Sequence, residues 1–143
     1  MFMNHQAHQA HQENIIREPD KILDDIGREI VDSAFTVHKE IGPGLLESAY
    51  EVFLLEELMD RGFNVKNQVP IEVKYKSRTV DIAYRIDILV NDCVLIELKA
   101  QEKILPIHAA QTLTYLNFAK IRLGYLINFN NRLIKDGIKR LAL

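Results

Sequence analysis

The sequence predicts an α/β fold in which helices flank a central mixed β-sheet. Apolar residues recur at helical spacing between positions 20 and 60. After position 62 the pattern changes to segments rich in Val, Ile and Tyr, separated by turn-forming residues. One further helical segment lies between two of these strand segments. The order helix, helix, strands, helix, strand is typical of a sandwich around a mixed sheet.

The helices are expected at Asp20–Ile41, at about Leu45–Asp60 and at about Pro106–Ala119. Gly42-Pro43-Gly44 ends the first helix, and Gly62 ends the second. Proline suits the first turn of the third helix, because the N–H that it lacks would have no partner there.

The strands are expected where β-branched and aromatic residues lie between turns. Lys76-Ser77-Arg78 and Asn91-Asp92 are two of these turns. A short element follows the last strand. The expected segments are Asn64–Gln68, Ile71–Lys76, Thr79–Val90, Cys93–Lys99, Arg122–Asn128 and the terminal Leu133–Leu141.

The length and composition favour a single compact domain. A chain of 143 residues with 48% hydrophobic and 27% charged residues can bury a core of its own. We expect this domain to span residues 20–143. Residues 1–19 are predicted to be a disordered tail, because no hydrophobic pattern accompanies their Gln, Ala and His residues. Weak metal binding by His5, His8 and His11 is the alternative.

The sequence also favours a cytoplasmic protein that crosses no membrane. No apolar run approaches the ~18 residues of a membrane span. The N-terminus lacks the basic and then apolar segments of a secretory signal. The one cysteine, Cys93, cannot form an internal disulfide and is expected to pack as a small hydrophobic residue in a buried strand.

The charges divide unevenly between the two parts of the chain. The net charge of −2 alone argues against a nucleic-acid partner. Residues 1–60 carry 13 acidic and 4 basic side chains, whereas residues 61–143 carry 7 acidic and 14 basic ones. This division can present a basic face to a nucleic acid, although an ordinary solvated surface is the alternative.

Three charged residues interrupt the most apolar strand segments: Asp87, Glu97 and Lys99. Charges are costly in such strands unless they are paired or bind a metal. Carboxylates suit Mg²⁺ or Mn²⁺, which would activate a water and stabilise charge on a phosphate; the Leu98 carbonyl could also bind the ion. Lys99 could orient the attacking water or stabilise the transition state. The alternative is a structural ion pair with Lys99 or Arg85.

The hydrophobic pattern predicts how these charged residues meet. A two-residue turn would mix charged and aliphatic side chains on both faces of the sheet. One additional turn residue pairs Asp87 with Glu97 and places Arg85 and Lys99 on the same face. We therefore predict a three-residue turn or a bulge at residues 91–93. The opposite, apolar face would consist of Ile86, Ile88, Val90, Val94, Ile96 and Leu98.

Two helical motifs are candidates to join this site. Glu47 and Tyr50 share a face of the second helix, and a carboxylate is favoured in a first turn. A simple helix-start charge and a core tyrosine are the alternatives. His108, Gln111 and Tyr115 share a face of the third helix, where Gln and Tyr could hydrogen-bond a phosphate, a water or a carboxylate. A polar surface stripe is the alternative, and His108 is expected only at the edge of the site.

Taken together, these motifs resemble the GxxExxY family of the PD-(D/E)xK nuclease superfamily. The resemblance covers about residues 21–143. Its motifs are G-x-x-E-x-x-Y at Gly44, Glu47 and Tyr50, the metal and lysine motif at Asp87, Glu97, Leu98 and Lys99, and the Q-x-x-x-Y of the RecB-like branch at Gln111 and Tyr115.

The resemblance implies a restriction-endonuclease-like αβββαβ core and Mg²⁺-type catalysis. It implies that Asp87 and Glu97 bind the metal with help from Glu47, and that Lys99 is catalytic. It also places Gln111 and Tyr115 at the rim of the site.

The leading functional hypothesis is a small metal-dependent nuclease that acts on DNA. The alternatives are a non-catalytic nucleic-acid-binding or assembly module with the same fold, and a hydrolase of another phosphate ester. A homodimer would grip DNA better than a lone domain of this size, although no sequence feature demonstrates one.

Overall fold

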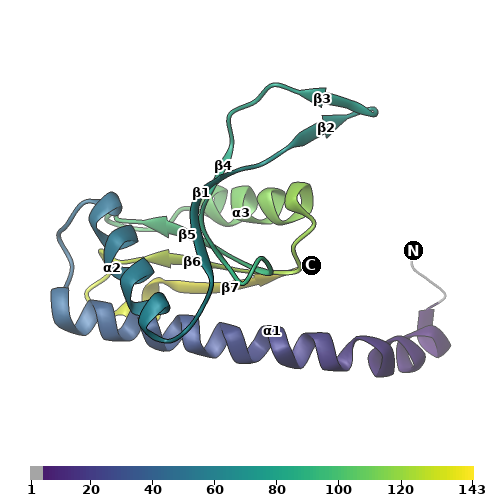
Figure 1. The fold of residues 1–143 in the computed structure, drawn as a ribbon, viewed down its shortest axis with the longest axis horizontal. Helices are drawn as coiled ribbons and strands as arrows, with labels where there is room; N and C mark the ends of the chain where they lie inside the picture. The colour runs from purple at the N-terminus through teal and green to yellow at the C-terminus, as the bar shows by residue number, and fades with distance from the viewer. Residues whose placement is uncertain (1–4) are drawn as a thin grey trace.

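A five-stranded mixed sheet with helices on both faces forms the body of the protein (Figure 1). The structure is a computed structural model that describes the backbone of residues 5–143 and the side chains of residues 21–143. The strand order is β1-β4-β5-β6-β7, in which β5 and β6 run parallel and the other neighbours run antiparallel. These strands are β1 (Val65–Pro70), β4 (Arg85–Val90), β5 (Val94–Lys99), β6 (Leu123–Asn128) and β7 (Ile138–Ala142).

The helices divide the core into two layers, one on each face of the sheet. Helices α1 (His5–Ile41) and α2 (Glu47–Asp60) pack on one face, where Ile30 and Leu54 are fully buried. Helix α3 (Pro106–Ala119) connects β5 to β6 and packs on the other face (Figure 1). The predicted α/β fold with a mixed sheet flanked by helices is confirmed, and it is consistent with a restriction-endonuclease-like core.

Helix α1 begins earlier than the sequence predicts. Its backbone is helical from His5, whereas the pattern of apolar residues predicts a start at Asp20. Most of the predicted tail therefore lies in this helix, while residues 1–4 and the side chains of His5, His8 and His11 lie outside the described part of the chain. The disorder of residues 1–19 and the boundaries of the single domain stay predictions.

The predicted strand Thr79–Val90 is wrong, because the chain leaves the strand conformation at residues 81–84. The first part is β3 (Arg78–Val80), which pairs with β2 (Val73–Tyr75) in a sheet of two strands. The second part is β4, in the main sheet. Residues 71–84 thus form an arm that projects from the ends of β1 and β4 (Figure 1).

The predicted terminal element is confirmed in position and consists of two parts. A 3-10 turn at Ile134–Gly137 comes first. Strand β7 then pairs with β6 and closes this edge of the sheet.

The register of β4 and β5 is the one that the hydrophobic pattern predicts. Val90 pairs with Val94, so the turn contains the three residues 91–93. The Cys93 N–H donates to the Val90 carbonyl at 3.0 Å. Asn91 and Asp92 adopt left-handed backbone angles, with φ of 50° and 55°. These two residue types tolerate that conformation better than other non-glycine residues, which explains why the turn forms here.

Two details of this hairpin differ from the prediction. Ile86 does not share the apolar face of Ile88; it packs with Leu89 in the layer beneath α3. Regular pairing is interrupted at Asp87, so the alternation of faces does not continue through it. Cys93 lies in the turn and not in a buried strand, and it is half-buried against the core as a free thiol.

Candidate nuclease site

The carboxylates of Asp87 and Glu97 meet across β4 and β5 and bind the backbone of the facing strand. The Leu98 N–H donates to Asp87 Oδ2 at 2.8 Å, and the Asp87 N–H donates to Glu97 Oε1 at 3.2 Å. The two side chains thus replace the regular backbone ladder, which ends at the pair Ile88 and Ile96. The three-residue turn produces this meeting, because a slip of one residue would put them on opposite faces.

Burial makes both carboxylates of this pair hard to ionise. Glu97 is only 6% exposed. Burial, followed by repulsion from Asp87, raises the pKa of Glu97 to about 8. Burial also raises the pKa of Asp87, although the hydrogen bond from the Leu98 N–H opposes this change. The ionised carboxylates are therefore unfavourable here unless a cation stabilises them.

Lys99 lies two residues after Glu97, on the same face of β5. Burial raises the pKa of both Asp87 and Glu97, and the positive charge of Lys99 opposes this rise. No ion pair within 4 Å joins Lys99 to a carboxylate among residues 21–143. A direct structural ion pair of Lys99, the alternative offered by the sequence, is therefore not formed.

Glu47 approaches the site from the first turn of α2. It is an exposed residue, yet its pKa is raised by loss of solvation and then by repulsion from Asp87, while Lys99 opposes this change. Helix α2 thus brings Glu47 close to the start of β4 and the end of β5, where Asp87 and Glu97 lie. Glu47 adds a third carboxylate to the electrostatic cluster.

Tyr50 does not face the site but holds the loop that precedes Glu47. It is fully buried, and its ring stacks on Phe129 with a centroid separation of 4.7 Å. Its hydroxyl donates to the Gly42 carbonyl at 2.6 Å and accepts from the Leu45 N–H at 3.1 Å. Tyr50 is thus a core tyrosine, which was the alternative interpretation of the sequence. Its hydroxyl also holds the loop from which α2 begins.

Gln111 and Tyr115 lie on the face of α3 that meets Glu97. The Gln111 amide donates to the Tyr115 hydroxyl at 3.0 Å. Burial raises the pKa of Tyr115, and the Glu97 charge raises it further. The Tyr84 ring, at the base of the arm, packs against the Tyr115 ring with a centroid separation of 5.4 Å.

Two of the supporting candidates, His108 and Arg85, have other contacts. The His108 ring accepts a hydrogen bond at Nδ1 from the Leu105 N–H, so it caps the start of α3. Arg85 is exposed and donates to the Gln68 carbonyl at 3.3 Å. Among residues 21–143, no hydrogen bond or ion pair links either side chain to Asp87 or Glu97.

Two further residues belong to the cluster and are not among the sequence candidates. Gln68 bridges the site, since its amide donates to Glu51 Oε1 at 2.8 Å and to Asp87 Oδ1 at 3.4 Å. Glu51 lies four residues after Glu47, so helical spacing could have revealed it. Gln68 has a φ of 52°, a left-handed conformation that no residue pattern indicated.

Comparison with known protein families shows which superfamily the chain belongs to. A sequence model of the PD-(D/E)XK nuclease superfamily matches residues 24–141. The chain belongs to the PD-(D/E)XK nuclease superfamily. No curated protein and no solved structure gives a significant match. Membership supports nuclease chemistry on a nucleic acid, while the family model does not resolve a finer branch.

Nucleases of the PD-(D/E)XK superfamily typically use divalent metals, and the donor chemistry of this site fits such an ion. Asp87 and Glu97 supply carboxylate oxygens, the ligands that a hard divalent cation prefers, and a bound cation would offset the cost of ionising them. Within residues 21–143 no group of three His, Cys, Asp or Glu side chains is arranged to hold a metal. A cation held by these two carboxylates would need water or substrate oxygens to complete its coordination.

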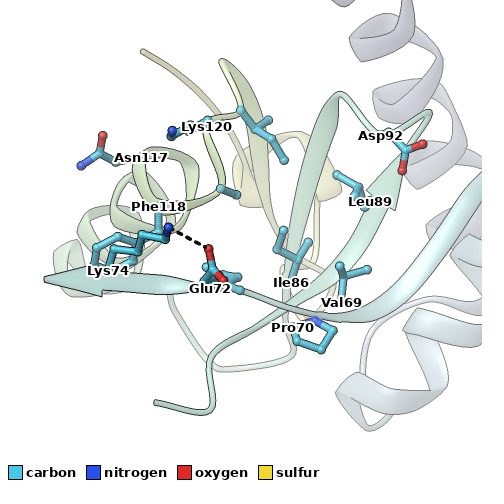
Figure 2. Close-up of a pocket in the computed structure, with 13 residues that line it drawn as sticks. Val69, Pro70, Glu72, Lys74, Ile86, Leu89, Asp92, Asn117, Phe118 and Lys120 are labelled. Atoms are coloured by element: carbon cyan, nitrogen blue, oxygen red, sulfur yellow. Dashed lines mark ion pairs between the residues drawn. The ribbon is translucent and has the colours of Figure 1, made fainter. Parts of the chain in front are cut away.

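A separate cleft of about 750 Å³ lies between the base of the arm and the C-terminal end of α3 (Figure 2). Ile86, Leu89 and Phe118 give it an apolar lining, and Glu72 pairs with Lys74 at 3.8 Å beside it. Neither Asp87 nor Glu97 lines this cleft. We therefore place the candidate catalytic site at the two carboxylates and not in this cleft.

Proposed function

We propose that this PD-(D/E)XK protein hydrolyses phosphodiester bonds of DNA in a reaction that requires Mg²⁺ or Mn²⁺. The observation that carries the proposal is the meeting of Asp87 and Glu97, with Lys99 on the same face. Asp87 lies close enough to Glu97 to raise the pKa of Glu97. Their charge is not neutralised by an ion pair within residues 21–143.

Each residue of the cluster then has a distinct role. Asp87 and Glu97 hold the cation, with the Leu98 carbonyl and Glu47 as further oxygen donors. When bound, the cation supplies Lewis-acid stabilisation of the phosphate charge and lowers the pKa of a water. Lys99 orients the attacking water or stabilises the negative charge that develops on the phosphate.

The residues around the carboxylates position the substrate. Gln111 and Tyr115 present an amide and a hydroxyl beside Glu97, where they can hydrogen-bond a phosphate oxygen. Arg85 is exposed at the start of β4 and offers a positive charge to the same backbone. His108 stays a candidate for the edge of the site, and Tyr50 acts on Glu47 through the loop.

One experiment separates this function from its alternatives. Linear, circular, branched and single-stranded DNA, together with RNA, are incubated with the protein in Mg²⁺, Mn²⁺ or EDTA. We expect metal-dependent cleavage of DNA that is lost in Asp87→Ala and in Lys99→Ala. Binding without cleavage, unchanged in both variants, would indicate a non-catalytic binding module, and cleavage that survives both substitutions would place the activity elsewhere.

Three finer assignments belong to the same proposal. We place the chain in the GxxExxY family of the RecB-like branch, because Gly44, Glu47 and Tyr50 precede the Gln111 and Tyr115 pair. We also propose action in the cytoplasm, in keeping with a free half-buried thiol. In the described helices no stretch is long and apolar enough to span a membrane. A homodimer on DNA is the expected assembly, which light scattering with and without DNA tests.

A further inference from the structure

The arm of residues 71–84 carries positive charge at its tip. Residues 73–80 contain three cations, Lys74, Lys76 and Arg78, and no carboxylate. Lys74 is partly neutralised by Glu72, at 3.8 Å, whereas neither Lys76 nor Arg78 has an ion pair within residues 21–143. All three residues are exposed. The tip therefore offers unpaired charge to a partner that is negative.

The cations lie on different sides of a narrow two-stranded ribbon. Lys74 is opposite Thr79, and Tyr75 is opposite Arg78, so Lys74 and Arg78 point to opposite faces. Lys76 is in the turn, where it and Ser77 have φ of 50° and 67°. Its ammonium lies 5.4 Å from the centre of the Tyr75 ring. The ribbon can thus reach phosphates on both of its sides at once.

The base of the arm is joined to the candidate site. The Ile71 N–H donates to the Tyr84 carbonyl at 2.9 Å, which closes the base. The Tyr84 ring then packs on Tyr115, whose pKa responds to the charge of Glu97. The arm projects beyond the sheet from this point (Figure 1). A long ligand that passes the carboxylates would therefore meet the arm.

We propose that this arm enters the major groove of duplex DNA and holds the phosphates on both walls of the groove. The proposal rests on the proposed nuclease function and names its substrate class as double-stranded. The major groove of B-form DNA admits a two-stranded β-ribbon, whereas the deep, narrow major groove of duplex RNA does not. A single-stranded nucleic acid would contact only one face of the ribbon, the face that carries the exposed Tyr75 ring.

Direct binding tests the arm separately from catalysis. Affinity for a fluorescent 30-base-pair DNA duplex is measured by anisotropy in EDTA, where a metal-dependent nuclease cannot cleave. The arm variant is Lys74→Ala/Lys76→Ala/Arg78→Ala. The control is Arg132→Ala/Lys135→Ala/Lys139→Ala, which removes the same charge from exposed residues at the β7 edge, away from the arm.

We expect the arm variant to bind the duplex at least about 30-fold more weakly near 0.1 M salt, with a salt dependence reduced by about two to three phosphate contacts. The control should lose less than about threefold, since its charges lie outside the contact. Thermal unfolding should be unchanged in both, because every substituted side chain is exposed. If the arm variant unfolds at a lower temperature than the wild type, the single substitution Lys76→Gln should still weaken binding by roughly fivefold.

The proposal is overturned if the arm variant binds like the wild type, or if the control loses as much affinity. Equal or tighter binding of single-stranded DNA or duplex RNA would also overturn it. Arm-dependent binding of duplex DNA, in a protein that cleaves nothing when Mg²⁺ or Mn²⁺ is added, would support the arm and contradict the nuclease function alone.

Discussion

At the scale of single residues, the protein places a carboxylate where a regular hairpin would place a backbone hydrogen bond. Asp87 accepts from the Leu98 N–H, and Glu97 accepts from the Asp87 N–H. Both carboxylates are thereby fixed in a low-dielectric region where their pKa values rise. On the proposed function, this cost in the stability of the metal-free protein is offset when the site binds a cation.

The raised pKa of Glu97 predicts how stability depends on pH. Folding takes up a proton between the ordinary glutamate pKa of 4.5 and about 8. The free energy of unfolding of the metal-free protein should therefore fall as the pH rises through this window. Glu97→Gln should flatten the fall and stabilise the protein above pH 8 by roughly 1–3 kcal/mol. Urea unfolding between pH 5 and 9 measures this effect, with the exposed Glu72→Gln as control.

An unchanged pH dependence in Glu97→Gln would contradict the assignment of this shift to Glu97. The Glu72→Gln control should follow the wild-type curve, because Glu72 is exposed and makes one long ion pair, at 3.8 Å.

At the scale of elements, α2 is positioned by the hydroxyl of Tyr50. Gly42 and Gly44 have φ of 77° and 107°, so the loop between α1 and α2 needs residues without a side chain at these points. The hydroxyl then joins both ends of this loop. Glu47 depends on this arrangement, because it is the first residue of α2.

Tyr50→Phe tests this positioning role. It removes the hydroxyl of a buried tyrosine that donates one hydrogen bond to the loop and accepts another from it, so we expect a loss of about 1–3 kcal/mol in the free energy of unfolding. Metal-dependent cleavage should fall by at least about tenfold under conditions where the variant is fully folded, because Glu47 loses its fixed position. Chemical unfolding and single-turnover cleavage measure the two effects. Tyr75→Phe, at a ring that is 58% exposed, is the control.

Loss of stability without loss of cleavage in Tyr50→Phe would show that the hydroxyl serves the fold alone. Equal effects in Tyr75→Phe would show that the removal of any tyrosine hydroxyl produces the change.

At the scale of the whole molecule, the close packing of α1 against the sheet holds the two halves of the chain together. A methyl group at Gly27 would overlap the hydroxyl of Tyr125 in β6. Gly27→Ala should therefore destabilise the protein by roughly 1–3 kcal/mol, although alanine favours helices. Thermal unfolding measures this. Glu40→Ala, at an exposed position of the same helix, should be nearly neutral, and a stabilised Gly27→Ala would contradict the packing.

The sequence predicted the features that depend on periodic patterns. Alternation of apolar residues was sufficient to derive the turn at residues 91–93 and the meeting of Asp87 with Glu97. The break at residues 81–84 was missed, since Thr79–Val90 continues a strand-like composition through it. Gln68 was missed because a left-handed backbone at glutamine has no sequence signal. Glu51 needed only the spacing of four from Glu47.

The central claim, that Asp87 is a metal-dependent catalytic carboxylate, is tested most directly by isosteric substitution. Single-turnover cleavage of labelled DNA in Mn²⁺ is compared for the wild type, Asp87→Asn and Asp92→Asn, the last being a matched change in the exposed turn of the same hairpin. We predict a loss of at least about 100-fold for Asp87→Asn, with no cleavage in EDTA, and near wild-type rates for Asp92→Asn. Cleavage by Asp87→Asn at the wild-type rate would contradict the account.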